Sequence, residues 1–301
     1  MTKLIAGSSS LKLAKKLSNM LGIDFVDAQT AYFEDRELRV EVANDLRGKD
    51  VVIVQSTSNP VNDHLMELLL LVNTVKYSGA SRVIAVLPYF GYARQNKVTS
   101  LNGPISAQLV STLFEVVGVD HLITVDLHAQ NITDFFSIPV QNVETTPLFA
   151  DFLRNRKNLM IVSPDAGSRI RAQKLSQALG CNFAVMNKIR KADTTCQMSG
   201  LNTNVAGYDC ILVDDIIDTG STLCCAAEFL VKQGALSVEA VVTHAVLSAK
   251  AAMRVEKSVI KQVSITQTIE QQVLPLKFHS LDVALLLGRK IKVLFEKDKR
   301  H

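Results

Sequence analysis

Short runs of consecutive apolar residues alternate along the chain with longer stretches in which apolar positions recur every three or four residues. Unbroken apolar runs are typical of strands buried in parallel sheets, and the helical spacing indicates amphipathic helices that pack on such sheets. The alternation therefore predicts an α/β fold, in which mostly parallel sheets are flanked by helices.

The predicted elements fall into two similar series. In the first half we expect strands at 3–6, 51–55, 82–87 and 121–127, and helices at 10–21, 60–77 and from Pro104 to about Val117. In the second half we expect strands at 158–162, 183–186, 210–213 and 238–243, with helices between them, one of them at 223–233. A strand, a polar turn, a helix, a Gly-Ala pair and a second strand recur at similar spacing in both halves. This weak repeat predicts two tandem α/β domains, 1–142 and 143–301, with the boundary near 139–145.

Composition adds limits to this picture. The 301 residues are 48% hydrophobic and 21% charged, which is typical of a globular protein with ample core. The net charge of +4 is too small to predict a nucleic-acid surface. No apolar stretch predicts a signal peptide or a membrane span, and the five cysteines show neither C-x-x-C nor metal-ligand spacing. We therefore expect reduced thiols and a cytoplasmic protein that binds neither nucleic acid nor membrane.

The most informative stretch begins with the predicted strand 210–213 and continues into the helix that follows. Asp214 and Asp215 come at the expected carboxyl end of that strand, where open α/β sheets bind ligands. The turn that opens the helix consists of Asp218, Thr219, Gly220, Ser221 and Thr222. Its backbone N–H groups and hydroxyls suit a phosphate monoester, whereas the acidic pair suits ribose hydroxyls or Mg²⁺. A ribose-phosphate site is favoured over a capped helix with solvated acids.

The first domain offers three further candidates. The segment 33–37, F-E-D-R-E, places one aromatic residue among charges, which suits a purine, although a solvated charged hairpin is the simpler interpretation. Arg94, Gln95 and Lys97 follow the aromatic turn 88–93 and suit a polyphosphate, while the tyrosines of that turn also fit simple packing. His128 follows the strand 121–127 and suits a Mg²⁺–nucleotide, although a lone histidine is more often structural.

The second domain adds an acid and a basic segment. Asp165 lies in a Pro- and Gly-containing turn after the strand 158–162 and is a candidate second acid for a metal, whereas Arg169 and Arg171 fit surface charges equally well. The basic run 187–191 opens a polar, weakly patterned segment that reaches Gly207. A loop of this length is typical of a functional lid or of disorder, and its cations suit transferring phosphates.

Taken together, these motifs resemble those of the ribose-phosphate pyrophosphokinase family, which is also called phosphoribosyl pyrophosphate synthetase. The carriers are F-E-D-R-E (33–37), the segment 53–69, P-Y-F-G-Y-A-R-Q (88–95), V-D-L-H-A (125–129), S-P-D-A-G (163–167) and D-D-I-I-D-T-G-S-T (214–222). The resemblance covers nearly the whole chain. It implies two tandem type I phosphoribosyltransferase-like domains that convert ATP and ribose 5-phosphate into phosphoribosyl pyrophosphate and AMP, with Mg²⁺.

The resemblance also implies a role for each matching residue. Phe33, Asp35 and Glu37 are expected to hold adenine across a subunit interface of a homo-oligomer, commonly a hexamer built from dimers, and Arg94 and Gln95 to bind ATP. His128 and Asp165 are expected at the Mg²⁺–ATP site. Asp214 and Asp215 are expected to bind the ribose hydroxyls and a second Mg²⁺, and residues 218–222 the 5-phosphate. Lys188 and Arg190 match the basic pair on the family's catalytic loop.

Several positions depart from the family pattern. Asn96 stands where Asp is common, the phosphate turn reads T-G-S-T instead of T-A-G-T, and Ser168 replaces the second glycine of a pair. Gln130-Asn131 and the C-terminal S-L-D-V-A-L-L-L differ where the family is regulated by phosphate and nucleotides, so such regulation is not implied.

Three rival interpretations stay open on the sequence. A base-transferring phosphoribosyltransferase shares 214–222 but needs one such domain and none of the motifs at 33–37, 88–95 and 125–129. A non-catalytic, synthetase-associated regulatory subunit is the binding-protein alternative, and the retained Lys188, Arg190 and acidic residues count against it. The third is a less regulated synthetase that accepts other nucleotide donors, which differs from the predicted enzyme only in its nucleotide donor and its regulation.

Overall fold

The structure, a computed structural model, describes residues 2–98, 101–190, 196–248 and 250–298, with the backbone alone for 188–190, 196–197 and 296–298. The chain forms two compact units. The first contains the chain up to Val143, Thr268–Glu270 and the described part of the segment that begins at Val283. The second contains Glu144–Gln267 and Gln271–Asp282. Both are α/β units with mostly parallel sheets, which confirms the predicted fold class.

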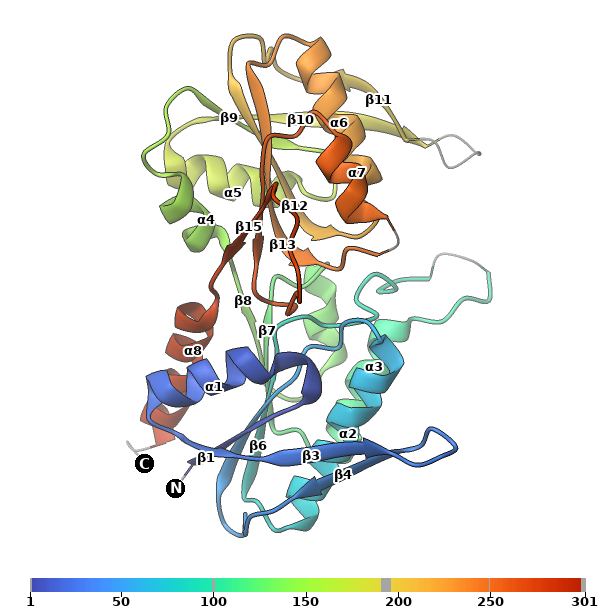
Figure 1. The fold of residues 1–301 in the computed structure, drawn as a ribbon, viewed down its shortest axis with the longest axis vertical. Coiled ribbons are helices and arrows are strands. Elements are labelled where there is room, and N and C mark those ends of the chain that lie inside the picture. Colours follow the sequence, from blue (N-terminus) through green and yellow to red (C-terminus); the bar gives the residue numbers. More distant parts are fainter. Residues whose placement is uncertain (1, 99–100, 191–195, 249, 299–301) are drawn as a thin grey trace. The chain divides into compact units, whose positions relative to one another are not determined.

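The first unit is built on a six-stranded sheet with the order β2-β1-β5-β6-β7-β8, and all of its pairings are parallel. Figure 1 shows helices α1 and α8 on one face of this sheet and α2 and α3 on the other. A separate antiparallel hairpin, β3–β4, packs against α2. The strands of this unit are β1 (Thr2–Ala6), β2 (Asp24–Val26), β3 (Ala28–Tyr32), β4 (Leu38–Val42), β5 (Asp50–Val54), β6 (Arg82–Leu87), β7 (His121–Val125) and β8 (Val140–Val143). Its helices are α1 (Leu11–Leu21), α2 (Val61–Tyr77), α3 (Ser106–Val117) and α8 (Ala284–Asp298), with short 3-10 helices at Ser8–Ser10 and Gln130–Phe135.

The C-terminal helix α8 belongs to the first unit, whereas the sequence predicts a second domain that contains all of 143–301. It packs against α1, and Gly288 lies so close to Met20 that an added Cβ would come within 2.1 Å of its Cε. The apolar face of α8 thus completes the cover of the first sheet. This pairing joins residues more than 260 positions apart in sequence, so local patterns cannot reveal it.

The second unit is built on a seven-stranded sheet with the order β11-β10-β9-β12-β13-β14-β15. Its strands are β9 (Leu159–Ser163), β10 (Asn182–Arg190), β11 (Cys196–Leu201), β12 (Asp209–Ile217), β13 (Ser237–Ala245), β14 (Val263–Thr266) and β15 (Phe278–Leu281). Its helices are α4 (Thr146–Leu153), α5 (Arg169–Leu179), α6 (Ser221–Lys232) and α7 (Ala251–Lys257). Helices α4 and α5 cover one face, and α6 and α7 the other (Figure 1). Apolar residues of β12 alternate between the two resulting cores, with Leu212 in one and Val213 in the other.

Two predictions about the strands of this unit were wrong. The segment from 187 to Gly207, which the sequence predicts to be a loop, contains strands in its described part, because β10 runs on to Arg190 and pairs antiparallel with β11. Strand β12 does not end at Val213 but continues to Ile217, because its partner β13 extends beside it as far as Ala245. Asp214 and Asp215 therefore lie within a strand.

Of the described cysteines, Cys181, Cys210, Cys224 and Cys225 carry free thiols. Burial raises the pKa of Cys210 to about 12, so this thiol stays protonated and inert. Among the described residues, no helix is both long enough and apolar enough to cross a membrane.

A buried carboxylate holds the polar end of strand β5 in the first unit. Glu67 on α2 is 2% exposed, and its two oxygens accept hydrogen bonds from Ser8 N (2.9 Å), Ser8 Oγ (2.5 Å), Thr30 Oγ1 (2.7 Å) and Gln55 Nε2 (2.6 Å). The four donors come from the turn after β1, from β3 and from the end of β5. One side chain thus joins the hairpin to the sheet.

We expect Glu67→Gln to lower the free energy of unfolding by about 2–4 kcal/mol, because an amide NH₂ would face donors at a buried position and leave them unpaired. Urea denaturation measures the change. Glu41→Gln on the exposed face of β4 is the matched control and should leave the midpoint unchanged. Equal midpoints for the two variants would show that the network contributes nothing to stability.

Candidate functional site

The acidic pair of the second unit lies where β12 loses one of its two neighbours. Strand β9 pairs with β12 only as far as Val162 and Leu212, whereas β13 accompanies β12 through Ile217. Beyond Leu212, one edge of β12 therefore faces the turn 163–168 instead of a strand. Ser168 Oγ donates to Asp214 Oδ1 at 2.6 Å, so the polar edge of the site is built by that turn.

The two carboxyl groups of this pair are not equivalent. Asp214 Oδ1 also accepts the backbone N–H of Asp215 at 3.0 Å, and the Asp215 carboxylate, 5% exposed, lies 3.6 Å from Arg171 Nη1. Burial and then the negative charge of Asp215 raise the pKa of Asp214 from 3.8 to about 7; the hydrogen bond from Ser168 opposes this rise. This carboxyl therefore stays largely protonated below about pH 7, and a cation or hydrogen-bond donor that reached it would favour its charged form.

Asp165 organises the neighbouring turn with its own side chain. Its Oδ1 accepts the backbone N–H of Gly167 at 2.9 Å and of Ser168 at 3.3 Å, and its carbonyl accepts Ser163 Oγ at 2.5 Å. Its charge also contributes to the raised pKa of Asp214. The structure thus brings Asp165 into the electrostatic surroundings of the acidic pair, although its Oδ1 is used in the turn.

The phosphate turn, residues 218–222, joins β12 directly to α6. Gly220 adopts φ = 74°, a left-handed conformation that glycine adopts without strain, and its carbonyl accepts the backbone N–H of Cys224 at 3.0 Å. Thr219 Oγ1 donates to Ser221 Oγ at 3.2 Å and accepts Ser221 N at 3.4 Å. The first N–H groups of α6 and the hydroxyls of this turn therefore gather at one helix N-terminus, an arrangement that suits an anion.

Some residues of this region escape a sequence-based search. In the sequence, Ser168 is only a departure from the family pattern, Arg171 fits a surface charge equally well, and nothing singles out Ser248 or Arg254. Ser248 Oγ donates to Asp218 Oδ1, and Arg254 Nη1 donates to the carbonyl of Thr219. No motif marks these two residues, because they follow β13 and reach the turn only through the fold.

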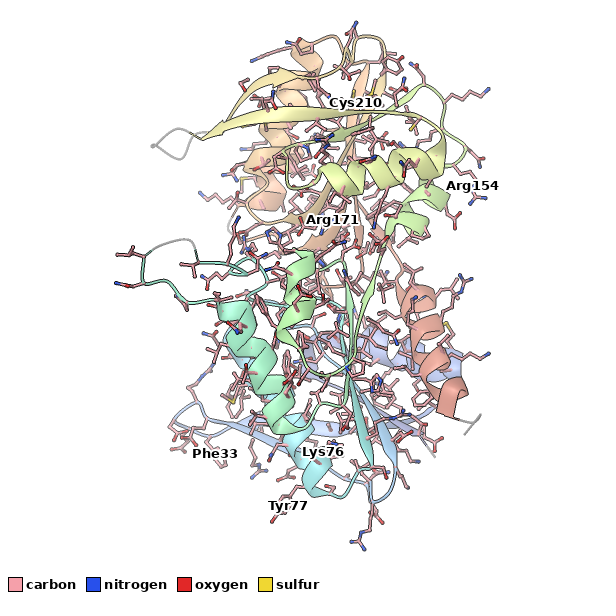
Figure 2. All side chains as sticks on the ribbon, turned by 180° about the vertical axis from the view of Figure 1, so that it is seen from behind. Phe33, Lys76, Tyr77, Arg154, Arg171 and Cys210 are labelled. Atoms are coloured by element: carbon pink, nitrogen blue, oxygen red, sulfur yellow. The ribbon has the colours of Figure 1, made fainter. Side chains whose placement is uncertain are left out.

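In the first unit, the segment 33–37 forms the tip of the β3–β4 hairpin. Phe33 N donates to the Glu37 carbonyl at 2.9 Å, and Glu37 N donates to Asp35 Oδ1 at 3.1 Å. The Phe33 ring is 50% exposed, with the Arg39 guanidinium 5.9 Å from its centre, and Figure 2 shows it at the end of the hairpin. A hairpin is present, as the simpler interpretation expected, and its tip presents an accessible aromatic face.

The aromatic turn after β6 is fixed from within. Gly91 N donates to Thr57 Oγ1 at 2.7 Å, and a Cβ at Gly91 would lie 2.5 Å from the Thr57 carbonyl. Tyr89 and Phe90 are buried, so packing does account for the aromatic residues. Arg94 and Gln95 follow as exposed side chains, and Gln95 Oε1 accepts Ser106 Oγ at the start of α3.

His128 is exposed, three residues after the end of β7, beyond a turn in which Leu127 N donates to Asn142 Oδ1 at 3.0 Å. Asn96 and Asn131 connect this region to the segment after Gln95, because Asn96 Nδ2 donates to Asn131 Oδ1 and Asn131 Nδ2 to the Asn96 carbonyl, each at 3.1 Å. The two departures from the family pattern at 96 and 130–131 are therefore in contact with each other.

Within the described residues, no group of three or more histidine, cysteine, aspartate or glutamate side chains is arranged to hold a metal ion. His128 belongs to the first unit and Asp165 to the second, so their joint metal site stays a prediction. Lys188 and Arg190 are the last basic residues of β10, and their side chains lie outside the described part of the structure.

Two family models match the chain. Residues 2–118 match the N-terminal domain of ribose phosphate pyrophosphokinase, and residues 144–277 match the phosphoribosyl transferase domain. Among curated proteins, the chain is 44% identical to the ribose-phosphate pyrophosphokinase of Rhizobium meliloti over 295 residues, which cover 96% of this chain and 95% of the relative. It is 40% identical to ribose-phosphate pyrophosphokinase 1 of Streptococcus pneumoniae, with coverage of 98% and 94%.

A solved structure is similar over the same length. The phosphoribosylpyrophosphate synthetase of Mycobacterium smegmatis superposes with a TM-score of 0.91 at 33% sequence identity, covering 98% of this chain and 99% of the other. The likeness therefore includes both units.

Proposed function

The chain belongs to the ribose-phosphate pyrophosphokinase family, and from that premise we propose that it transfers the β,γ-diphosphoryl group of ATP to the anomeric hydroxyl of ribose 5-phosphate. The hydroxyl oxygen forms a bond to the β-phosphorus, and the bond from that phosphorus to the α,β-bridging oxygen breaks. AMP leaves with the bridging oxygen, and the hydroxyl proton passes to solvent. The products are phosphoribosyl pyrophosphate and AMP.

A single observation carries the ribose 5-phosphate part of the proposal. One strand, β12, carries Asp214 and Asp215 and leads within three residues into the turn 218–222 at the start of α6. Carboxylates accept hydrogen bonds from ribose hydroxyls, and the helix N-terminus offers N–H groups to the 5-phosphate. The ribose hydroxyls and the 5-phosphate of one sugar phosphate would thus both be bound by groups of a single segment.

The ATP part rests on the first unit. Phe33 offers an aromatic face for adenine, and Asp35 and Glu37 belong to the same hairpin tip, where Glu37 N donates to Asp35 Oδ1. Arg94 and Gln95 are exposed directly after a rigid turn, and a guanidinium fork suits phosphate oxygens. We assign adenine recognition to the hairpin and polyphosphate binding to Arg94 and Gln95.

The carboxylates of the second unit fit Mg²⁺. Its preferred ligands are oxygens, and burial together with the neighbouring charge of Asp215 raises the pKa of Asp214, so a bound cation would favour its charged form. Because Mg²⁺ keeps several waters and binds substrate phosphates, it does not need a cluster of three side chains. Asp214 and Asp215 would hold one ion, and Asp165 and His128 a Mg²⁺–ATP. When bound, Mg²⁺ neutralises phosphate charge.

The protein's own contribution is orientation and charge neutralisation. Phosphoryl-group transfer needs little covalent chemistry from an enzyme, and alignment of the attacking and leaving oxygens supplies much of the rate. We assign the neutralisation of charge on the transferred group to Lys188 and Arg190. We assign the holding of the sugar, by its ribose hydroxyls, to Asp214 and Asp215.

The assay that tests this function mixes the protein with Mg²⁺, ribose 5-phosphate and each nucleoside triphosphate in turn, and follows nucleoside monophosphate by chromatography. We expect AMP from ATP, and no AMP once a chelator removes Mg²⁺. Absence of any nucleoside monophosphate would exclude an enzyme and favour the regulatory-subunit interpretation. Release of pyrophosphate on addition of a base and phosphoribosyl pyrophosphate would instead indicate a base-transferring phosphoribosyltransferase.

We also propose a homo-oligomeric, cytoplasmic enzyme in which the hairpin tip serves the ATP site of a neighbouring subunit. The half-exposed Phe33 supports this, because an aromatic ring at a hairpin tip is available to a second chain. Light scattering that gave the mass of a single chain for the active enzyme would contradict it.

A further inference from the structure

A segment outside the known motifs holds the phosphate turn residue by residue. Leu247 N donates to the carbonyl of Ile217 at 3.0 Å, Ser248 Oγ donates to Asp218 Oδ1, and Arg254 Nη1 donates to the carbonyl of Thr219. The next residue, Gly220, lies against Ala251 and Val255 of α7, and an added Cβ would be 3.6 Å from the Ala251 carbonyl and 3.5 Å from Val255 Cγ2.

Four consecutive positions, 217–220, thus each meet a partner from the segment 247–255. This matters for binding because a turn that is already held in shape loses little conformational entropy when its ligand arrives. It also fixes the direction of the Thr219 carbonyl. Arg254 therefore keeps that carbonyl from turning toward an anion bound at residues 220–222.

The phosphate turn itself contains no positive charge. Residues 218–222 are one acid, three hydroxyl residues and a glycine, and the first turn of α6 adds no basic residue. A phosphate monoester carries close to two negative charges at neutral pH and would lie beside the Asp218 carboxylate. A nearby cation would compensate part of this charge.

Arg254 is placed to supply this charge. It is exposed on α7, and its guanidinium lies at the Thr219 carbonyl in the middle of the turn. A guanidinium has five N–H donors in a rigid fork, and the carbonyl uses one of them. The others can reach phosphate oxygens while the first keeps its bond to the turn.

We propose that Arg254 is a binding residue for the 5-phosphate of ribose 5-phosphate, and that Arg254 and Ser248 together position the phosphate turn. The inference rests on the proposed function, because it assigns the 5-phosphate to residues 218–222. It adds a positively charged residue from α7 to a site that the sequence motifs describe without one.

The test compares Arg254→Met and Arg254→Lys with Lys257→Met, which removes a charge from the same helix three residues further on. Arg254→Met should raise the KM for ribose 5-phosphate about 30- to 100-fold, with kcat and the KM for ATP within about threefold of the wild type. Arg254→Lys should recover part of the affinity, because a point charge remains but the fork is lost. Lys257→Met should behave as the wild type. Ser248→Ala, which removes only a positioning contact, should raise the same KM about 3- to 10-fold.

Calorimetric titration of ribose 5-phosphate without ATP separates this inference from the proposed function. A weaker Kd in Arg254→Met, with an unchanged melting temperature and a flatter dependence of log Kd on salt concentration, would support a direct charge contact. An unchanged Kd in an enzyme that makes AMP would overturn the inference and leave the function intact. A variant whose Kd for ribose 5-phosphate, KM for ATP and melting temperature all change together would show a purely structural role, which also overturns it. A wild-type protein that makes no AMP would overturn the function.

Discussion

Replacing Lys188 or Arg190 by alanine is expected to lower kcat about a thousandfold, while the Kd for ATP stays within about threefold of the wild type. The reaction moves a highly charged diphosphoryl group, and its transition state gains most from cations placed where charge develops. Both residues belong to the end of β10, two positions apart, and the backbone there is held by pairing with β11. Strand pairing supplies a defined base for this basic pair, in a segment that the sequence predicts to be a functional lid or disordered.

The measurement is a single-turnover rate combined with ATP binding by calorimetry, so that chemistry and affinity are read separately. Lys157 is an exposed lysine of the same unit just before β9. Lys157→Ala is therefore the matched control and should leave the single-turnover rate and the Kd for ATP unchanged. The double variant should lose little more than either single variant if the two residues act as a unit. Equal losses of ATP affinity and of turnover in the single variants would mean that the basic pair binds substrate and has no special role in the transition state.

Asp214→Asn is expected to remove about two to three orders of magnitude of kcat/KM for ribose 5-phosphate and, at pH 8, to raise the melting temperature. Asparagine keeps an oxygen for Ser168 but loses the charge that accepts a hydrogen bond from a ribose hydroxyl. It also removes a buried charge that repels Asp215. Activity and stability should therefore change in opposite directions.

The expected rise in melting temperature follows from the raised pKa of Asp214. In the folded protein this carboxyl keeps its proton up to about pH 7, whereas in the unfolded chain it loses the proton near pH 3.8. Between these values the folded state binds more protons, so the stability of the wild type falls as pH rises through this window and stays low above it. Asparagine does not titrate, so the gain in melting temperature should grow from about pH 4 to pH 7.

Melting curves of both proteins at pH 5 and pH 8 test the stability part, and ribose 5-phosphate kinetics test the activity part. Asp209→Asn, at the opposite end of β12, is the matched control and should leave kcat/KM unchanged. For the wild type, the KM for ribose 5-phosphate should fall as pH rises through about 7, because Asp214 gains its charge there. A gain in melting temperature that is the same at both pH values would show that Asp214 is already ionised at pH 5.

The sequence predicts the strands that depend only on local pattern. Unbroken apolar runs such as 51–54 and 210–213 are buried on both faces of their sheets. The acids after 213 mark a candidate site, whereas the polar residues after 54 belong to an internal network. The structure places the acidic pair and residues 218–222 on one continuous strand and turn, as their spacing in the sequence suggests.

What the sequence does not predict depends on distant partners. Strand β12 is longer than its apolar run because β13 supports it, and α8 joins the first unit because its face matches α1. Ser168, Ser248 and Arg254 carry no motif, yet each reaches the acidic pair or the phosphate turn. Figure 2 labels Arg171 and Arg154, two arginines of the second unit whose ion-pair partners cannot be told from the sequence alone. Only the fold pairs Arg171 with Asp215, whereas Arg154 pairs with Asp151, three residues before it in the sequence.

The buried network around Glu67 bears on how many sugar phosphates one chain can hold. The end of β5 corresponds, in the repeat, to the end of β12, but Gln55, Ser56, Thr57 and Ser58 are all buried there, and Gln55 donates to Glu67. The protein's own side chains fill the place where the other copy presents its acids. With ribose 5-phosphate assigned to the second unit, we therefore expect one molecule of ribose 5-phosphate for each chain, although the chain contains two similar domains.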